Sequence, residues 1–269
     1  MIRRARREGR GVFPPLVFLD QARTLTVPGR AGEISLRIFE PERPRGAYLH
    51  LHGGGWMLGS ADGQDAWLWE IAQATSLTVV SVEYRLAPEH PFPAGPDDAE
   101  DAARWILEQY DGRLAIGGES AGAHLAVAAL LRLRESGVSR FDAANLVFGP
   151  FDLTGTPSRR LWGERDLILS GPMMDWFADC FLPGMPLAER QSAEVSPLFA
   201  DLHGLPPALF TCGTLDPLLD DSLFMEARWR QAGNDAELAV YAEGIHGFTA
   251  FPLELARRAR AAQIAFLRG

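Results

Sequence analysis

The stretch from Leu114 to Ala129 joins a short apolar strand to an Ala- and Leu-rich helix through a turn rich in glycine. Gly118, Ser120 and Gly122 in this turn fit the G-x-S-x-G pattern of a tight strand-to-helix turn that exposes a serine hydroxyl. The flanking positions require glycine because a Cβ there would collide with the neighbouring strand and helix. The stretch therefore predicts a sheet whose strands lead directly into helices, with Ser120 at the start of one helix.

The expected position of Ser120 suits a nucleophile. A helix N-terminus has amides without intrahelical partners, and together with the helix dipole they stabilise developing negative charge. A pattern this short occurs by chance in roughly one chain in ten of this length and glycine content. The assignment of Ser120 therefore depends on partner residues elsewhere in the chain.

The other elements are predicted from hydrophobic periodicity and turn residues. Strands are expected at residues 23–27, 34–39, 47–51, 77–82, 145–148, 206–212 and 236–241, in addition to the one that leads to Ser120; helices are expected at 65–74, 97–109, 121 to about 137, 220–231 and 253–267. The first two strands read as an antiparallel hairpin at a sheet edge. The alternation of strands and helices predicts an α/β fold in a single domain over residues 1–269.

Two segments fall outside this alternation. Residues 1–20 read as a loosely structured arm, and residues 152–200 place five Trp and Phe side chains among Pro, Gly and polar residues without a strand pattern. We interpret the second segment as a helical insertion whose aromatic residues cover a cleft, so that both segments are cap or lid elements. The alternative is an ordinary pair of peripheral helices.

Composition limits the classes of partner. The net charge is −9, although Met1–Arg10 alone carries +4, so the body of the protein is a poor match for nucleic acid or an anionic membrane. No apolar run approaches the ~20 residues of a membrane span, and the basic start lacks the apolar stretch of an export signal. Cys180 and Cys212 lack disulfide or metal-ligand spacing. We expect two buried free thiols and a cytoplasmic protein.

A triple glycine follows the third strand, in the order His52, Gly53, Gly54, Gly55, Trp56. Such a loop can turn its amide groups outward toward a ligand oxygen, and upstream of a G-x-S-x-G turn it corresponds to an oxyanion loop of the H-G-G-G type. The alternative is a flexible turn. His50 and His52 share one strand face, but no carboxylate or cysteine set stands at ligand spacing, so we expect no metal.

Candidate partners for Ser120 follow later strands. Asp216 follows the strand at 206–212 after three further residues, and His246 follows the last strand. The order Ser, Asp, His is the one expected on this kind of sheet, whose parallel strand ends converge at one edge. A neutral imidazole can accept the serine proton, and a carboxylate can fix its tautomer. Asp216 is preferred over Asp220 and Asp221, which lie a helical turn further on.

Two other histidines compete for a functional role. His203 lies in a loop that is not visibly tied to a strand end, so His246 is the preferred base. His124 stands four residues after Ser120 on the same helix face, but one turn along it points into the packing. We expect His124 to be a core residue.

Five segments together make the sequence recognisable: His52-Gly-Gly-Gly-Trp, Glu83-Tyr-Arg-Leu-Ala-Pro-Glu-His-Pro-Phe-Pro-Ala, Gly118-Glu-Ser-Ala-Gly, Asp216-Pro-Leu-Leu-Asp-Asp and His246-Gly-Phe. From about residue 25 onward the chain resembles the bacterial esterase branch of the hormone-sensitive-lipase family, within the α/β-hydrolase superfamily. The resemblance implies an eight-stranded, mostly parallel sheet with helices on both faces and a small helical cap.

The resemblance also implies which residues catalyse the reaction. The nucleophile would be Ser120, the acid Asp216 and the base His246. The amides of Gly54, Gly55 and Ala121 would bind the oxyanion, and no cofactor is expected. The reaction implied is hydrolysis of carboxylic esters with short to medium acyl chains through an acyl-enzyme. Trp56, Met57 and Phe248 are the expected substrate contacts, and a homodimer is common in the family.

Two other functions remain open at this point. An amidase or aryl-formamidase would keep the same machinery and change the bond that is cleaved. A non-catalytic small-molecule receptor of this family would lack the base histidine, whereas His246 is present. The chain also departs from the family in having only about fifty residues before His52, where a longer helical segment usually forms part of the cap.

Overall fold

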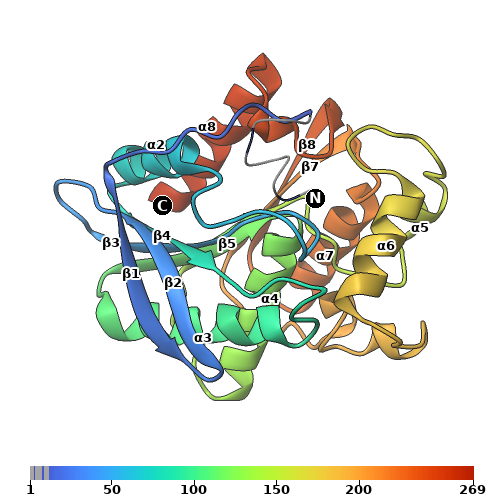
Figure 1. Ribbon diagram of the computed structural model, residues 1–269, viewed down its shortest axis with the longest axis horizontal. Helices are drawn as coiled ribbons and strands as arrows, with labels where there is room; N and C mark the ends of the chain where they lie inside the picture. The colour runs from blue at the N-terminus through green and yellow to red at the C-terminus, as the bar shows by residue number, and fades with distance from the viewer. Residues whose placement is uncertain (1–2, 4–7, 9–11) are drawn as a thin grey trace.

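A single eight-stranded sheet organises the chain, with strand order β1-β2-β4-β3-β5-β6-β7-β8 (Figure 1). The computed structural model describes residues 3, 8 and 12–269. The strands are β1 (Ala22–Gly29), β2 (Gly32–Phe39), β3 (Gly46–Leu51), β4 (Thr78–Glu83), β5 (Arg113–Glu119), β6 (Ala143–Val147), β7 (Ala208–Leu215) and β8 (Ala236–Ile245). The strands from β4 to β8 in this order are parallel, and β1 and β2 are antiparallel at one edge.

Helices cover both faces of the sheet. They are α2 (Asp65–Thr75), α3 (Ala94–Gln109), α4 (Ala121–Glu135), α7 (Leu219–Gln231) and α8 (Glu254–Arg268). The largest buried cluster joins α3, α4 and α7 to one face, and two smaller clusters join α2 and α8 to the other. The expected fold, a mostly parallel eight-stranded sheet between two helical layers, is confirmed.

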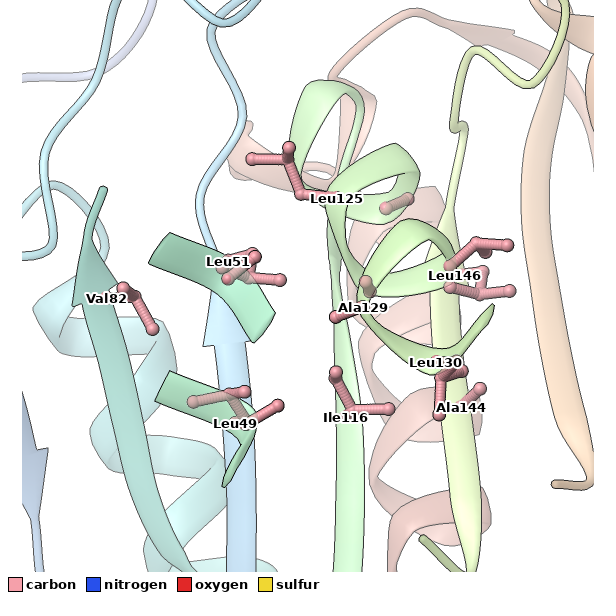
Figure 2. Close-up of a cluster of buried hydrophobic side chains, with 14 of the residues drawn as sticks. Leu49, Leu51, Val82, Ile116, Leu125, Ala129, Leu130, Ala144 and Leu146 are labelled. Carbon is pink, nitrogen blue, oxygen red and sulfur yellow. The ribbon is translucent and has the colours of Figure 1, made fainter. Parts of the chain in front are cut away.

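Strand alternation decides which side chains reach each layer. Leu49 and Leu51 of β3 and Ile116 of β5 point toward the face covered by α4, where Leu125 and Ala129 meet them (Figure 2). Tyr48 and Ala115, each one residue before a member of this set, point to the opposite face and pack near α2 and α8. Because parallel strands are covered on both faces, β3 and β6 are buried along their whole length.

The segment between β6 and β7 is helical, as expected. It contains α5 (Pro157–Arg160), α6 (Gly171–Phe181) and the short 3-10 helices η1 (Glu189–Gln191) and η2 (Pro197–Phe199). Helices α5 and α6 lie together at one end of the molecule beside α7 (Figure 1). One expectation is wrong here: Cys180 on α6 is only half-buried, because α6 has solvent on one side, while Cys212 in β7 is buried.

Element bounds differ from the expected ones mainly at two places. Helix α3 begins at Ala94, three residues early, directly after Pro93. Strand β8 runs on to Ile245, four residues beyond the apolar stretch, and so carries the chain up to His246. None of the helices in the described part of the chain combines the length and the apolar character needed to cross a membrane.

The described parts of the N-terminal arm lie on the body of the protein. Leu19 donates a backbone hydrogen bond to Asp65 at the start of α2, and Phe13 stacks on Phe251 at a ring distance of 5.6 Å. Arg3 donates to the carbonyl of Met57. The expectation of a loose arm also concerns residues 1–2, 4–7 and 9–11, which lie outside the described residues.

Candidate active site

Ser120 sits at the sharp turn between β5 and α4, as its motif predicts. Its backbone has φ 53° and ψ −122°, a conformation that L-residues rarely adopt. Its amide is bonded to the carbonyl of Val147 in β6 at 2.9 Å, and its carbonyl accepts from Ala123 at 2.9 Å. The neighbouring strand and the helix thus hold the turn in place, with the serine at the helix N-terminus.

Two glycines make this turn possible. A Cβ on Gly118 would lie 2.2 Å from the carbonyl oxygen of Leu51 in β3, and one on Gly122 would lie 1.8 Å from the same oxygen. Backbone atoms of a central strand cannot move away, so both positions exclude any side chain. The pattern therefore reflects the close approach of α4 to β3.

The structure brings Ser120, His246 and Asp216 together. The Nε2 atom of His246 lies 3.0 Å from the Ser120 hydroxyl, and its Nδ1 atom lies 2.9 Å from Oδ2 of Asp216. An ionised carboxylate can only accept, so the proton of the neutral ring is on Nδ1 and Nε2 accepts from the serine. The arrangement can draw a proton from the hydroxyl.

Burial orients the histidine and the aspartate. Asp216 is 1% exposed and His246 5% exposed, and the second carboxylate oxygen accepts from the amide of Leu218 at 2.8 Å. The ring of Phe148, at the end of β6, packs against the imidazole with a centroid distance of 4.8 Å. Packing and hydrogen bonds therefore leave the imidazole one orientation, toward Ser120.

The competing acids contact other groups. Asp220 accepts from the amide of Ser158 at 2.7 Å, and Asp221 accepts from the amides of Phe151 and Asp152. Both carboxylates therefore hold the start of the insertion against α7. Burial raises the pKa of Asp221 to about 7.

The competing histidines also lie elsewhere. His203 is exposed and contacts Asp201, far from any strand end of the site. His50 contacts Gln64 through Nε2, and His52 contacts the carbonyl of Gly53 through Nδ1. Within the described residues, no three His, Cys, Asp or Glu side chains are grouped so that they could hold a metal ion.

The glycine loop after β3 lies directly over the serine turn. A Cβ on Gly53 would be 3.5 Å from the Cβ of Ser120, and Gly54 and Gly55 have φ values of 129° and 59° that favour glycine. Among the hydrogen bonds of the described residues, none is donated by the amides of Gly54, Gly55 or Ala121. These amides are therefore available to a bound oxygen.

Trp56 anchors this loop to the rest of the site. Its indole Nε1 donates to Nδ1 of His124 at 3.2 Å, and its ring stacks on Phe181 of α6 at 4.7 Å with an interplanar angle of 7°. The Trp56 carbonyl accepts from the amide of Ala87, and the Tyr84 hydroxyl donates to the carbonyl of His52. The loop is thus attached to α4, α6 and the proline-rich connection.

His124 is fully buried, as expected for a core residue, but it also positions the loop. An indole nitrogen can only donate, so Nδ1 of His124 accepts and its Nε2–H donates to the carbonyl of Val195 at 2.9 Å. Burial lowers the pKa of His124 to about 4. The neutral ring therefore links the helix after Ser120, the glycine loop and the insertion.

A cavity of about 40 Å³ opens beside Ser120. Its lining combines both loops of the site with side chains of the insertion and of α7: Gly55, Trp56, Ser120, Ala121, Pro150, Arg159, Leu169, Met174, Phe177 and Leu218. Of the three expected substrate contacts, only Trp56 is among them. A volume of this size holds about three water molecules, so the enclosed group is small.

The other two expected contacts point into the core. Met57 is 5% exposed and belongs to the main buried cluster, because the turn at Trp56, with φ 59°, sends successive side chains in different directions. Phe248 is fully buried against Phe148 and Tyr241, on the face covered by α8. Neither lines the cavity.

Half of the lining residues were not predicted. Met174 and Phe177 lie on α6, and Arg159 lies on the one-turn helix α5. Phe177 was among the aromatic residues expected to cover a cleft, and a Cβ on Gly55 would be 2.6 Å from its ring. Arg159 and Met174 could not be predicted, because an irregular insertion has no hydrophobic periodicity that indicates which of its sides is buried.

With this geometry in place, the class of protein can be stated. The sequence model of the alpha/beta hydrolase fold family matches residues 48–250, and the chain belongs to that family. The resemblance to esterases of the hormone-sensitive-lipase type is confirmed by the relatives and solved structures that match.

Three of these are similar over most of the chain. The carboxylic ester hydrolase LipN of Mycobacterium tuberculosis is 34% identical over 83% of this chain, which spans 63% of LipN. The carboxylesterase NlhH of the same species is 32% identical over 85% of this chain and 75% of its own. A solved esterase of Pyrobaculum calidifontis is 35% identical with a TM-score of 0.88, covering 94% of this chain and 86% of that one. The family therefore contains ester hydrolases, as expected.

Proposed function

We propose that the protein is a serine carboxylesterase that hydrolyses esters with short acyl chains through an acyl-enzyme. The observation that carries the proposal is the continuous hydrogen-bonded array from Ser120 through His246 to Asp216. Relatives named carboxylic ester hydrolase, carboxylesterase and esterase support the type of reaction. The small cavity beside Ser120 supports the short end of the short-to-medium range.

The first half of the reaction forms the acyl-enzyme. The Ser120 oxygen attacks the ester carbonyl carbon while His246 Nε2 takes the hydroxyl proton. The carbonyl oxygen becomes an oxyanion, for which the amides of Gly54, Gly55 and Ala121 are the donors we propose. The carbon–oxygen bond to the alcohol then breaks, and the imidazolium returns the proton to the leaving alcohol.

The second half releases the acid. A water molecule attacks the acyl carbon and gives a proton to His246, and the bond to Ser120 breaks as the serine recovers its proton. Asp216 stays ionised throughout, because it accepts from the Nδ1–H and stabilises the imidazolium. The sum is one ester and one water converted to one carboxylic acid and one alcohol.

Hydrolysis of p-nitrophenyl acetate, butyrate and octanoate tests the proposal. We expect turnover that is fastest with the two short esters and that falls about 10⁴-fold or more in Ser120→Ala. Ser139→Ala, which removes an exposed serine after α4, is the matched control and should keep full activity. Undiminished turnover in Ser120→Ala, or faster hydrolysis of a p-nitroanilide than of the matching ester, would refute the assignment.

A further inference from the structure

Arg159 brings a positive charge to a cavity that is otherwise uncharged. It is the one ionised side chain among the cavity-lining residues, all of which lie in the described part of the chain. The same cavity is lined by Ser120, and its small volume means that any group held there lies close to both. A charged group in such a place affects which esters can bind.

The side chain of Arg159 is mostly buried and has few partners. It is 10% exposed, and within the described residues its one side-chain hydrogen bond goes from Nη2 to Asp175 at 2.9 Å. A guanidinium has five N–H donors in a planar fork, and this contact uses one of them. The free donors would be satisfied by a bidentate acceptor such as a carboxylate.

The ion pair with Asp175 does not occupy the site firmly. The Asp175 side chain is 73% exposed on α6, and a pair with one partner in water adds little stability. A ligand carboxylate inside the cavity would meet the same guanidinium with less solvent around it. The ion pair therefore orients the guanidinium in the absence of a ligand, and it leaves N–H donors of Arg159 that a ligand can use.

The backbone that carries Arg159 is fixed to the catalytic loop. Ser158 donates through its hydroxyl to the carbonyl of Pro217 at 2.7 Å, and its amide donates to Asp220 at 2.7 Å. Pro217 directly follows Asp216, so α5 and the aspartate loop are bonded side by side. A side chain that extends from a backbone fixed in this way can contribute to specificity, because less ordering is needed on binding.

We propose that Arg159 is a specificity-determining residue and that the preferred substrates are small esters carrying a second, ionised carboxylate. This inference rests on the function proposed above. The carboxylate can belong to the acyl part, as in a monoester of a short dicarboxylic acid, or to the alcohol part, as in an acylated hydroxy acid. In both cases the carboxylate binds the guanidinium and is not changed, while the one ester bond is hydrolysed.

Pairs of esters with the same shape isolate the charge. On the acyl side, methyl hydrogen succinate is compared with methyl 4-methylpentanoate, in which an isopropyl group replaces the carboxylate. On the alcohol side, acetoxyacetate is compared with isobutyl acetate. Acid release is followed by titration at constant pH. In the wild-type protein we expect the anionic member of at least one pair to have a kcat/KM about 10- to 100-fold higher.

Two variants of equal charge test the role of Arg159. Arg159→Met should lose about 10- to 100-fold of kcat/KM on the anionic ester relative to its neutral counterpart, mainly through KM. Arg160→Met changes the net charge equally at an exposed neighbouring residue and should leave the preference unchanged. Asp175→Asn frees the guanidinium and should raise kcat/KM on the anionic ester about two- to fivefold.

The outcomes separate this inference from the function on which it rests. If the wild type hydrolyses neutral esters without preferring an anionic one, or if Arg159→Met and Arg160→Met have the same preference, the inference is wrong and the esterase assignment stands. If Arg159→Met and Asp175→Asn slow both members of a pair equally, Arg159 only joins α5 to α6. If no ester is hydrolysed, the proposed function fails first.

Discussion

Trp56 Nε1 lies 3.2 Å from Nδ1 of His124, deep between the glycine loop and the helix that begins after Ser120. The bond exists only while His124 is neutral, because a protonated ring has no acceptor nitrogen. Acid should therefore weaken the attachment of the loop as well as the fold.

The first prediction concerns stability in mild acid. Burial lowers the pKa of His124 to about 4, so between pH 6.5 and pH 4 the unfolded chain binds a proton that the folded chain does not. Stability is therefore lost as the pH falls through this window, on the order of 3 kcal/mol for the full shift. Urea denaturation at pH 7, 5.5 and 4.5 measures the loss.

A variant assigns this loss to His124. His124→Leu should be less stable at pH 7, because Trp56 and the Val195 carbonyl lose their partner, but its stability should fall less steeply with acid. His50, whose pKa is also lowered to about 4 by burial, keeps part of the slope in that variant. His90→Gln, at an exposed site, is the control with an unchanged slope. Equal slopes in His124→Leu and the wild type would contradict the prediction.

The second prediction separates the three aspartates after β7. Asp216→Asn should lower kcat about 10⁴-fold, since an amide no longer holds the His246 proton on Nδ1. Asp220→Asn should keep most of the activity, because Asp220 contacts Ser158 of the insertion and not the histidine. Steady-state kinetics on p-nitrophenyl acetate gives both values. A larger loss in Asp220→Asn than in Asp216→Asn would show that Asp220, and not Asp216, is the acid that supports His246.

The third prediction concerns the glycine at the start of α4. A Cβ on Gly122 would lie 1.8 Å from the Leu51 carbonyl oxygen, so Gly122→Ala must push α4 away from β3. We expect a loss of about 3 kcal/mol in stability, together with lower activity. Gly137→Ala is the control: its φ of 80° strains alanine by about 1–2 kcal/mol, but nothing lies within 4 Å. Equal destabilisation of the two variants would contradict the prediction, because the contact with β3 would then add nothing to the cost of an alanine at Gly122.

The fourth prediction concerns the length of the acyl chain. Met174 lines the cavity beside Ser120, whereas its neighbour Met173 is 36% exposed on the same helix. Met174→Ala should favour longer p-nitrophenyl esters, by about fourfold in kcat/KM for each methylene that becomes buried. Met173→Ala should not change the preference. A chain-length profile that stays unchanged in Met174→Ala would mean that the acyl chain binds elsewhere.

Sequence reasoning was most effective where backbone geometry restricts the residue type. The turn at Ser120 needs glycine on both sides, and parallel strand ends converge, so Asp216 and His246 could be expected near it. The preference for Asp216 over Asp220 and Asp221 also agrees with the contacts of the three carboxylates. That Asp220 and Asp221 hold the insertion against α7 could not be predicted, because their partners lie 60 to 70 residues away in the sequence. Such contacts leave no local pattern.

The lining of the cavity beside Ser120 could be predicted only in part. Met57 and Phe248 are neighbours of motif residues in sequence, but a sharp turn and a 3-10 helix direct them into the core. Arg159, Leu169 and Met174 come from an insertion without periodicity. Only the folding of the insertion against α7 and the glycine loop decides which of its residues line the cavity.

The most direct test of the central claim is to find the covalent intermediate. The protein is treated with diethyl p-nitrophenyl phosphate, and the modified residue is located by intact mass and peptide mapping. We expect one diethylphosphoryl group per chain on Ser120, one equivalent of p-nitrophenol released, and neither in Ser120→Ala. A stable adduct on another residue, or none in a protein that hydrolyses esters, would contradict the assignment of Ser120 as the nucleophile activated by His246.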